Sequence, residues 1–137
     1  TLPDFRFANG DGHMKRIILE MGMGNDLYGE DYTKAACRAV QDALHHSSLI
    51  LFRSLGFDHD DMQVKVTIGV QNPDKVDCKA VAATLPRGQA QVLAVKGGQN
   101  VTDREHDTVS VIATAAIEAY LDIDPNDWTL SSPSDER

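Results

Sequence analysis

The feature that most constrains the fold is a change in hydrophobic period along the chain. Between Asp31 and His46 the apolar residues recur at i, i+3, i+4 and i+7, which predicts an amphipathic helix capped by Asp31. Between Val64 and Val70 they alternate with polar residues, which predicts a strand with one buried face. The consecutive β-formers of Arg16–Met21 predict a central strand, which we expect to end at Gly22.

Three further elements complete the predicted order. A helix is expected from Pro73 to Pro86, a strand over Ala90–Val95, and a strongly apolar helix over Asp107–Leu121 with Asp107 as its cap. The order β-α-β-α-β-α predicts an α/β (α+β) fold, a two-layer sandwich with a small mixed sheet and helices mainly on one face. Whether Leu49–Leu55 continues the preceding helix stays open.

Composition limits the classes of function. The chain has 137 residues, 42% of them hydrophobic, with a net charge of -8. An acidic protein repels phosphate backbones, so we expect no nucleic-acid partner. Without an apolar run of membrane-spanning length or a signal-peptide pattern, we expect no membrane partner and a cytoplasmic location. Cys37 and Cys78 are then expected to be reduced thiols.

The expected organisation is one domain over residues 14–130. Gly12-His13-Met14 is typical of a cloning junction, so residues 1–13 are expected to be a tag or vector-derived segment. Residues 131–137 are rich in Ser, Pro and charge and are expected to form a flexible tail. A small sheet and an apolar last helix gain from packing against a copy, so we expect a homo-oligomer.

The segment Gly22–Gly29 is the leading candidate site, because it follows a strand and precedes a helix. Loops at the carboxyl ends of strands bind ligands in open α/β sheets, and glycine admits close approach. The dinucleotide and phosphate-loop motifs are both incomplete here, which favours a polar ligand or a cation over a nucleotide. The candidate ligand-binding residues are Gly22, Gly24, Asp26, Tyr28, Gly29, Thr33, Lys34, Gly97 and Gly98.

Asp26, Lys65 and Lys96 are the candidate catalytic residues. Asp26 would orient a ligand or metal, and a lysine of depressed pKa would act as a base or bind an anion. The alternatives are a tight turn in which Asp26 holds backbone amides, and solvated lysines. A divalent metal held by Asp26, His106 and Asp107 is a further alternative, as are His45 or His46 as a base and Ser47 or Ser48 as a nucleophile.

The motif Gly22-x-Gly24-x-Asp26-x-x-Gly29, followed by Asp31–Ala43, resembles the listerial "Lin" family of conserved hypothetical proteins, whose motif is Gly-x-Gly-x-Asp-x-His-Gly. The resemblance runs from Met14 to about Ile123, and Tyr28 replaces the family's histidine. It implies a shared fold and site, and no particular reaction. The segment Leu55–Asp58 through Val64–Val66 has a fold-level likeness to cyanuric acid hydrolases and barbiturases, with Lys65 on the matching segment.

Two functional hypotheses follow. The first is a small-molecule binding protein or enzyme, with hydrolytic or acid–base chemistry on a small polar metabolite at the Gly22–Gly29 segment. The alternative is a non-catalytic homo-oligomeric interaction protein that assembles through the apolar segment Val109–Leu121.

Overall fold

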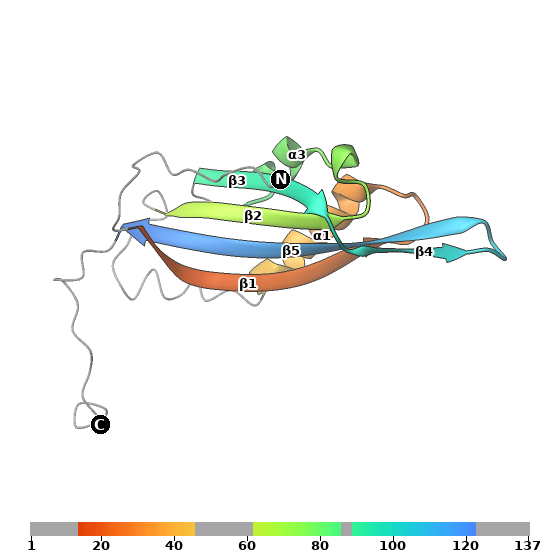
Figure 1. The fold of residues 1–137 in the computed structure, drawn as a ribbon, viewed down its shortest axis with the longest axis horizontal. Coiled ribbons are helices and arrows are strands. Elements are labelled where there is room, and N and C mark those ends of the chain that lie inside the picture. The colour runs from red at the N-terminus through yellow and green to blue at the C-terminus, as the bar shows by residue number, and fades with distance from the viewer. Residues whose placement is uncertain (1–13, 46–61, 86–88, 123–137) are drawn as a thin grey trace, which may run out of the picture.

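The protein has a mixed α/β fold built around a five-stranded sheet (Figure 1). The computed structural model describes residues 14–45, 62–85 and 89–122. Its elements are β1 (Met14–Asp26), α1 (Tyr32–His45), β2 (Gln63–Val70), the 3-10 helix η2 (Pro73–Lys75), α3 (Cys78–Ala83), β3 (Gln89–Lys96), β4 (Gln99–Asp103) and β5 (Thr108–Asp122). The expectations for residues 1–13, 46–61 and 131–137, which include His46, Ser47 and Ser48, lie outside the described residues.

The sheet is mixed, as expected. Its order is β1-β5-β2-β3, and β4 pairs with β5 beyond the end of β2. Strand β5 is antiparallel to β1, β2 and β4, and β2 is parallel to β3 across the α3 crossover. The β4–β5 hairpin therefore projects past the other strands (Figure 1). No helix among the described residues is long and apolar enough to cross a membrane.

The core lies between the sheet and one side of α1. One side of α1 is fully buried, and its residues are Ala35, Ala36, Ala39, Val40 and Ala43. It packs against the buried residues of β2 and β5, which are Val64, Val66, Ile68 and Val70 and the odd-numbered residues from Val111 to Leu121. Helix α3 joins this layer through Val81, which is fully buried. Tyr32 at the start of α1 is buried too, and its hydroxyl accepts hydrogen bonds from the Asn72 and Asn100 amides at 2.9 and 2.7 Å.

The predicted helix over Asp107–Leu121 is wrong, because this segment forms β5. Its apolar residues satisfy both periods: alanines and β-branched residues occupy alternate positions and also extend around a helix. Three neighbouring strands supply hydrogen bonds along β5, and this tertiary pairing overrides the helical interpretation. Asp107 is consequently no helix cap and sits in the hairpin turn with φ 50°.

Two other boundaries differ from the prediction. The prediction of a central strand over Arg16–Met21 is wrong, because β1 lies at the edge of the described sheet and pairs with β5 alone among its strands. Strand β1 also does not end at Gly22 but runs on to Asp26, so the first five residues of the expected loop belong to a strand. The helix expected from Pro73 is divided into η2 and α3, because the Asp77 carboxylate caps α3 by accepting from the Lys79 and Ala80 amides at 3.1 and 3.2 Å. Helix α1, its Asp31 cap, β2 and β3 match the prediction closely.

Gly22 and Gly24 let α1 rest directly on β1. A Cβ at Gly22 would lie 2.6 Å from the Ala39 carbonyl oxygen, and one at Gly24 would lie 2.6 Å from the Arg38 carbonyl carbon. These atoms belong to helix backbone, which cannot move aside cheaply. The two glycines are thus explained by helix–strand packing.

Replacing Gly24 with alanine should therefore lower the free energy of unfolding by about 2–3 kcal/mol, because α1 must move off the sheet. Gly29→Ala is the matched control: its new Cβ meets no backbone atom and lies 2.9 Å from the Asp26 Oδ2, a side-chain atom that relieves the contact with a small shift while it keeps its bond to the Asp31 amide. We expect a loss of about 1 kcal/mol or less for the control. Urea unfolding of both variants measures this, and equal losses would contradict the packing role.

Candidate functional site

Asp26 lies at the junction of β1 and α1 and is 6% exposed. Its Oδ2 accepts a hydrogen bond from the Asp31 amide at 2.9 Å. Its Oδ1 faces two cations, the Arg38 guanidinium at 3.7 Å and the Lys34 ammonium at 4.0 Å. A buried carboxylate requires such partners, because an isolated charge away from water is costly.

Lys34 and Arg38 come from the helix, one turn apart, so both reach the end of β1. Their side chains are about half exposed, at 54% and 48%. Arg38 also donates to the Asn25 carbonyl oxygen at 2.6 Å, which fixes the guanidinium over the strand end. The exposed surface of this corner therefore carries two cations, Lys34 and Arg38, together with the exposed carboxylate of Asp31, and Asp26 lies beneath them.

A hollow of about 460 Å³ opens at this corner. It is lined by Asn25, Asp26, Leu27, Tyr28, Gly29, Asp31, Lys34 and Arg38. We call this hollow the junction pocket. Its volume lies within the range of small-molecule sites, and its lining is richer in charge than most of them.

The junction pocket contains four of the residues expected for the site: Asp26, Tyr28, Gly29 and Lys34. Tyr28 is 79% exposed, so its hydroxyl is available to solvent or a ligand. Thr33, also expected for the site, does not line the pocket: its hydroxyl accepts from the Asp77 amide at 2.8 Å, which links α1 to α3.

The structure separates Lys65 and Lys96 from Asp26. Lys65 lies on the face of β2 away from α1, whereas Asp26 lies on the α1 side of β1. Through β5, Lys65 is in register with Leu19, seven residues along β1 from Asp26, or about 23 Å. A catalytic centre formed by Asp26 with Lys65 is therefore incompatible with this fold.

Lys65 instead belongs to a charged cluster on the sheet. Glu118 accepts from Arg16 at 3.2 Å and from the Tyr120 hydroxyl at 2.7 Å, and it lies 3.8 Å from the Lys65 ammonium. Partial burial opposes ionisation of Glu118, but these hydrogen bonds and cations outweigh it and lower the pKa of Glu118. Burial and the bond to Glu118 raise the pKa of Tyr120.

Gly97 and Gly98 carry the chain from β3 across the end of β2 to β4. Gly98 has φ 61°, and a Cβ there would collide with the Ile112 carbonyl and lie 2.7 Å from the Gly69 oxygen. Gln71 fixes the crossing by donating to the Gly97 and Gly98 carbonyls at 3.1 and 3.3 Å. The crossing explains both glycines as structural.

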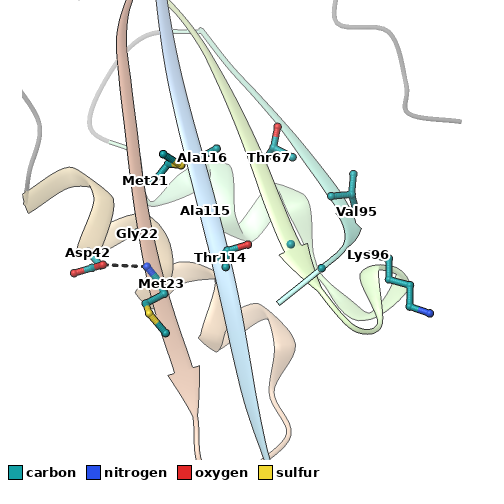
Figure 2. Close-up of a pocket in the computed structure, with 12 residues that line it drawn as sticks. Met21, Gly22, Met23, Asp42, Thr67, Val95, Lys96, Thr114, Ala115 and Ala116 are labelled. Atoms are coloured by element: carbon teal, nitrogen blue, oxygen red, sulfur yellow. Dashed lines mark hydrogen bonds between the residues drawn. The ribbon is translucent and has the colours of Figure 1, made fainter. Parts of the chain in front are cut away.

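A second hollow, of about 590 Å³, lies over the strands on the side away from the junction pocket (Figure 2). Three residues expected for the site line it: Gly22, Lys96 and Gly97. Its remaining lining is mostly small or apolar: Met21, Met23, Asp42, Thr67, Gly69, Val95, Thr114, Ala115 and Ala116. We call it the sheet hollow. The expected single site is thus divided between two hollows, and Gly24, Thr33, Lys65 and Gly98 line neither.

Neither a metal centre nor a reactive thiol has support among the residues that the structure describes. Within them, no group of three or more His, Cys, Asp or Glu side chains could hold a metal ion. His106 binds Asp103 at 2.8 Å within the β4–β5 hairpin. Burial, Asp31 and Asp77 raise the pKa of Cys37, which keeps this thiol protonated and unreactive. Both cysteines are free.

Arg38 and Asp42 are the site residues that sequence reasoning missed. The signal was present, because Lys34, Arg38 and Asp42 follow at i, i+4 and i+8 and so form one stripe along the helix. This stripe faces the outer edge of β1. The Asp42 carboxylate accepts from the Met23 amide at 3.0 Å, as Arg38 binds the Asn25 carbonyl (Figure 2 shows the Asp42 bond).

The fold and the junction pocket define an α/β domain with a charged corner between its first strand and first helix. Residues 16–119 match the model of the family described as conserved hypothetical protein (Lin0512_fam), and the chain belongs to this family. A crystal structure of an FtsZ-like protein of unknown function from Nostoc punctiforme PCC 73102 is similar, with 34% identity and a TM-score of 0.72 over 80% of this chain and 98% of that one. No curated protein matches the chain.

Replacing Asp26 with alanine should lower the free energy of unfolding by about 1–3 kcal/mol, since the Asp31 amide loses its acceptor and two cations lose their counter-charge. Thermal unfolding at pH 7 tests this, with Asp74→Ala as the control, because Asp74 is exposed. A variant as stable as the wild type would show that Asp26 does not hold the turn.

Replacing Glu118 with glutamine should cost about 1 kcal/mol at pH 7. Because its folded pKa is lowered, the Glu118 contribution is present above the ordinary glutamate value of about 4.3 and is lost as the pH falls through the folded value. The stability difference between wild type and variant should therefore shrink below about pH 4. Urea unfolding from pH 3 to 7 checks this, with the exposed Glu105→Gln as control; a constant difference would contradict it.

Proposed function

We propose that this protein binds a small polar metabolite carrying an anionic group, such as a carboxylate, in the junction pocket. The observation that supports the proposal is the pair Lys34 and Arg38, two half-exposed cations held side by side over a buried carboxylate. Asp26 neutralises part of their charge and fixes their positions, so a ligand meets pre-organised donors.

The charge distribution favours an anion over a cation. Asp26 is enclosed and occupied, and the Asp31 carboxylate caps α1 by accepting from the Lys34 amide at 3.0 Å. The guanidinium of Arg38, in contrast, has five N–H donors, of which one is used on Asn25. The neighbouring start of α1 adds positive potential. Tyr28, where the family motif has histidine, offers a hydroxyl at the rim that donates or accepts a hydrogen bond.

Binding fits this geometry better than hydrolytic or acid–base catalysis. A general base needs a free lone pair directed at the substrate. Both Asp26 oxygens already face the Asp31 amide, Lys34 or Arg38. The lysines expected to assist lie elsewhere: Lys65 beside Glu118, and Lys96 at the end of β3.

Thermal shift measurements with small anions test the proposal. Acetate, succinate and inorganic phosphate, at constant ionic strength set with chloride, are the first probes, followed by a panel of small carboxylic acids. A true ligand at ten times its dissociation constant stabilises by about 1.4 kcal/mol, which shifts Tm by several degrees. The shift should saturate and should be lost in Arg38→Gln.

Lys79→Gln is the matched control, because Lys79 is an exposed lysine on α3 outside the junction pocket. It should keep the full response. No saturating shift with any anion would contradict the proposal, as would an equal response in Arg38→Gln and the wild type.

The second candidate function is assembly without catalysis. The sequence supported assembly through a predicted apolar helix over Val109–Leu121, but this segment belongs to strand β5. A different observation now favours assembly: the side of the sheet opposite α1 exposes apolar side chains, among them Met21 at 68% and Met23 at 57%. Large exposed apolar areas in a soluble domain indicate an interaction surface.

A further inference from the structure

The face of the sheet opposite α1 and α3 is covered by no helix that the structure describes (Figure 1). We call it the open face. Its residues align in rows across the strands. One row contains Met21, Ala116, Thr67 and Leu93, and the next contains Met23, Thr114, Gly69 and Val95.

The two rows combine projections with a depression. Met21 and Met23 stand on the outer strand β1 and are 68% and 57% exposed, with Leu19 beside them at 43%. The central strands carry only small residues at these positions, which produces the sheet hollow of about 590 Å³. Figure 2 shows both methionines on β1, on one side of β5, with Thr67 and Val95 on the other side.

Side chains of α1 protect the outer edge of β1 against pairing with another strand. Asp42 accepts from the Met23 amide at 3.0 Å, and Arg38 donates to the Asn25 carbonyl at 2.6 Å. Side chains of α1 thus occupy backbone groups that a further strand would need. Assembly by extending the sheet at this end of β1 is disfavoured, so the open face is the better surface for a partner.

We propose that a second copy of this chain covers the open face in a two-fold symmetric dimer. A two-fold interface requires one surface to complement itself, so every projection must find a depression on the same surface. Methionine is well suited to this, because its flexible side chain fills irregular gaps. Met21 and Met23 of each copy enter the sheet hollow of the other.

The area and the charge of the open face agree with a second copy as occupant. Strand lengths and spacings give the face roughly 700 Å², close to the 800 Å² or so that each partner contributes to a standard interface. The chain carries a net charge of -8, which opposes contact between copies over most of the surface. On the open face, Arg16 and Lys65 are already paired with Glu118, so two such faces approach without strong repulsion.

Size-exclusion chromatography with light scattering tests the dimer. The wild type at about 10–100 µM, at or above the dissociation constants of standard-size interfaces, should have twice the 15.0 kDa mass of the chain. The double variant Met21→Glu, Met23→Glu should weaken association at least about 100-fold, because buried unpaired charges cost several kcal/mol. Leu27→Glu is the matched control: Leu27 is 46% exposed but lies in the junction pocket. It should remain dimeric.

Ala116→Arg is a second variant, which fills the sheet hollow without altering β1 and should also dissociate the dimer. Circular dichroism verifies that each variant is folded. A monomeric wild type would overturn the proposal. So would a dimer that both folded variants leave intact, since it would use another surface.

Oxidation of the unmodified protein by hydrogen peroxide provides an independent measurement. Exposed methionine is converted to sulfoxide, and burial slows the reaction. Peptide mass spectrometry should find Met21 and Met23 protected at high protein concentration and oxidised faster on dilution. Protection that persists on dilution to a concentration at which light scattering finds the monomer would show that another part of the chain covers the face, and fast oxidation at every concentration would show that nothing does. Either result would overturn the proposal.

Discussion

The whole structure depends on the direct contact of α1 with β1. Gly22 and Gly24 have no side chain, so the helix backbone at Ala39 and Ala43 lies against the strand. Close-packed interiors tolerate few added atoms, and this contact leaves no room for one. The same close contact explains the small residues of the helix and of β5, because only short side chains fit between the sheet and a helix held so near it.

The close contact places three polar residues of the helix beside the strand. Lys34 and Arg38 reach Asp26, and Arg38 and Asp42 reach backbone groups at the outer edge of β1. With a larger separation between helix and strand, these side chains would extend into solvent. The glycines therefore create the junction pocket indirectly: they bring the cations to Asp26, although they do not line the pocket as an open, ligand-admitting loop would.

The sequence predicted elements well where only one period fits. Helix α1 and strand β2 agree with the prediction within about a residue, because helical and alternating patterns are distinct there. Strand β5 was predicted to be a helix, since alanine and isoleucine at consecutive positions fit both the helical and the alternating period. The three strands that pair with this segment determine that it is a strand. The extension of β1 through Gly24 was missed for a related reason: glycine usually ends a strand, and only a helix crossing above it explains its presence.

The candidate site was only partly predicted, because local sequence determines some of its neighbours and tertiary structure determines the others. Asp26 and Lys34 are close in sequence, so a strand-to-helix junction brings them together whatever the rest of the fold. Alternation along β2 places Lys65 on its polar face, but the distance of Lys65 and Lys96 from Asp26 depends on strand order, which is not encoded locally. A one-residue shift in the position of Lys65 along β2 would move it to the other face of the sheet.

Strand β1 serves both proposed interactions, and the pleat keeps them apart. Even-numbered residues from Gly22 to Asp26 face α1 and lead to the junction pocket, whereas Met21 and Met23 face the opposite side. A second copy on the open face therefore leaves Lys34 and Arg38 accessible. The two interactions still share the helix stripe, because Arg38 both lines the pocket and protects the outer edge of β1. Loss of Arg38 would accordingly remove a donor to the proposed ligand and expose a strand edge, while loss of Met21 affects only the open face.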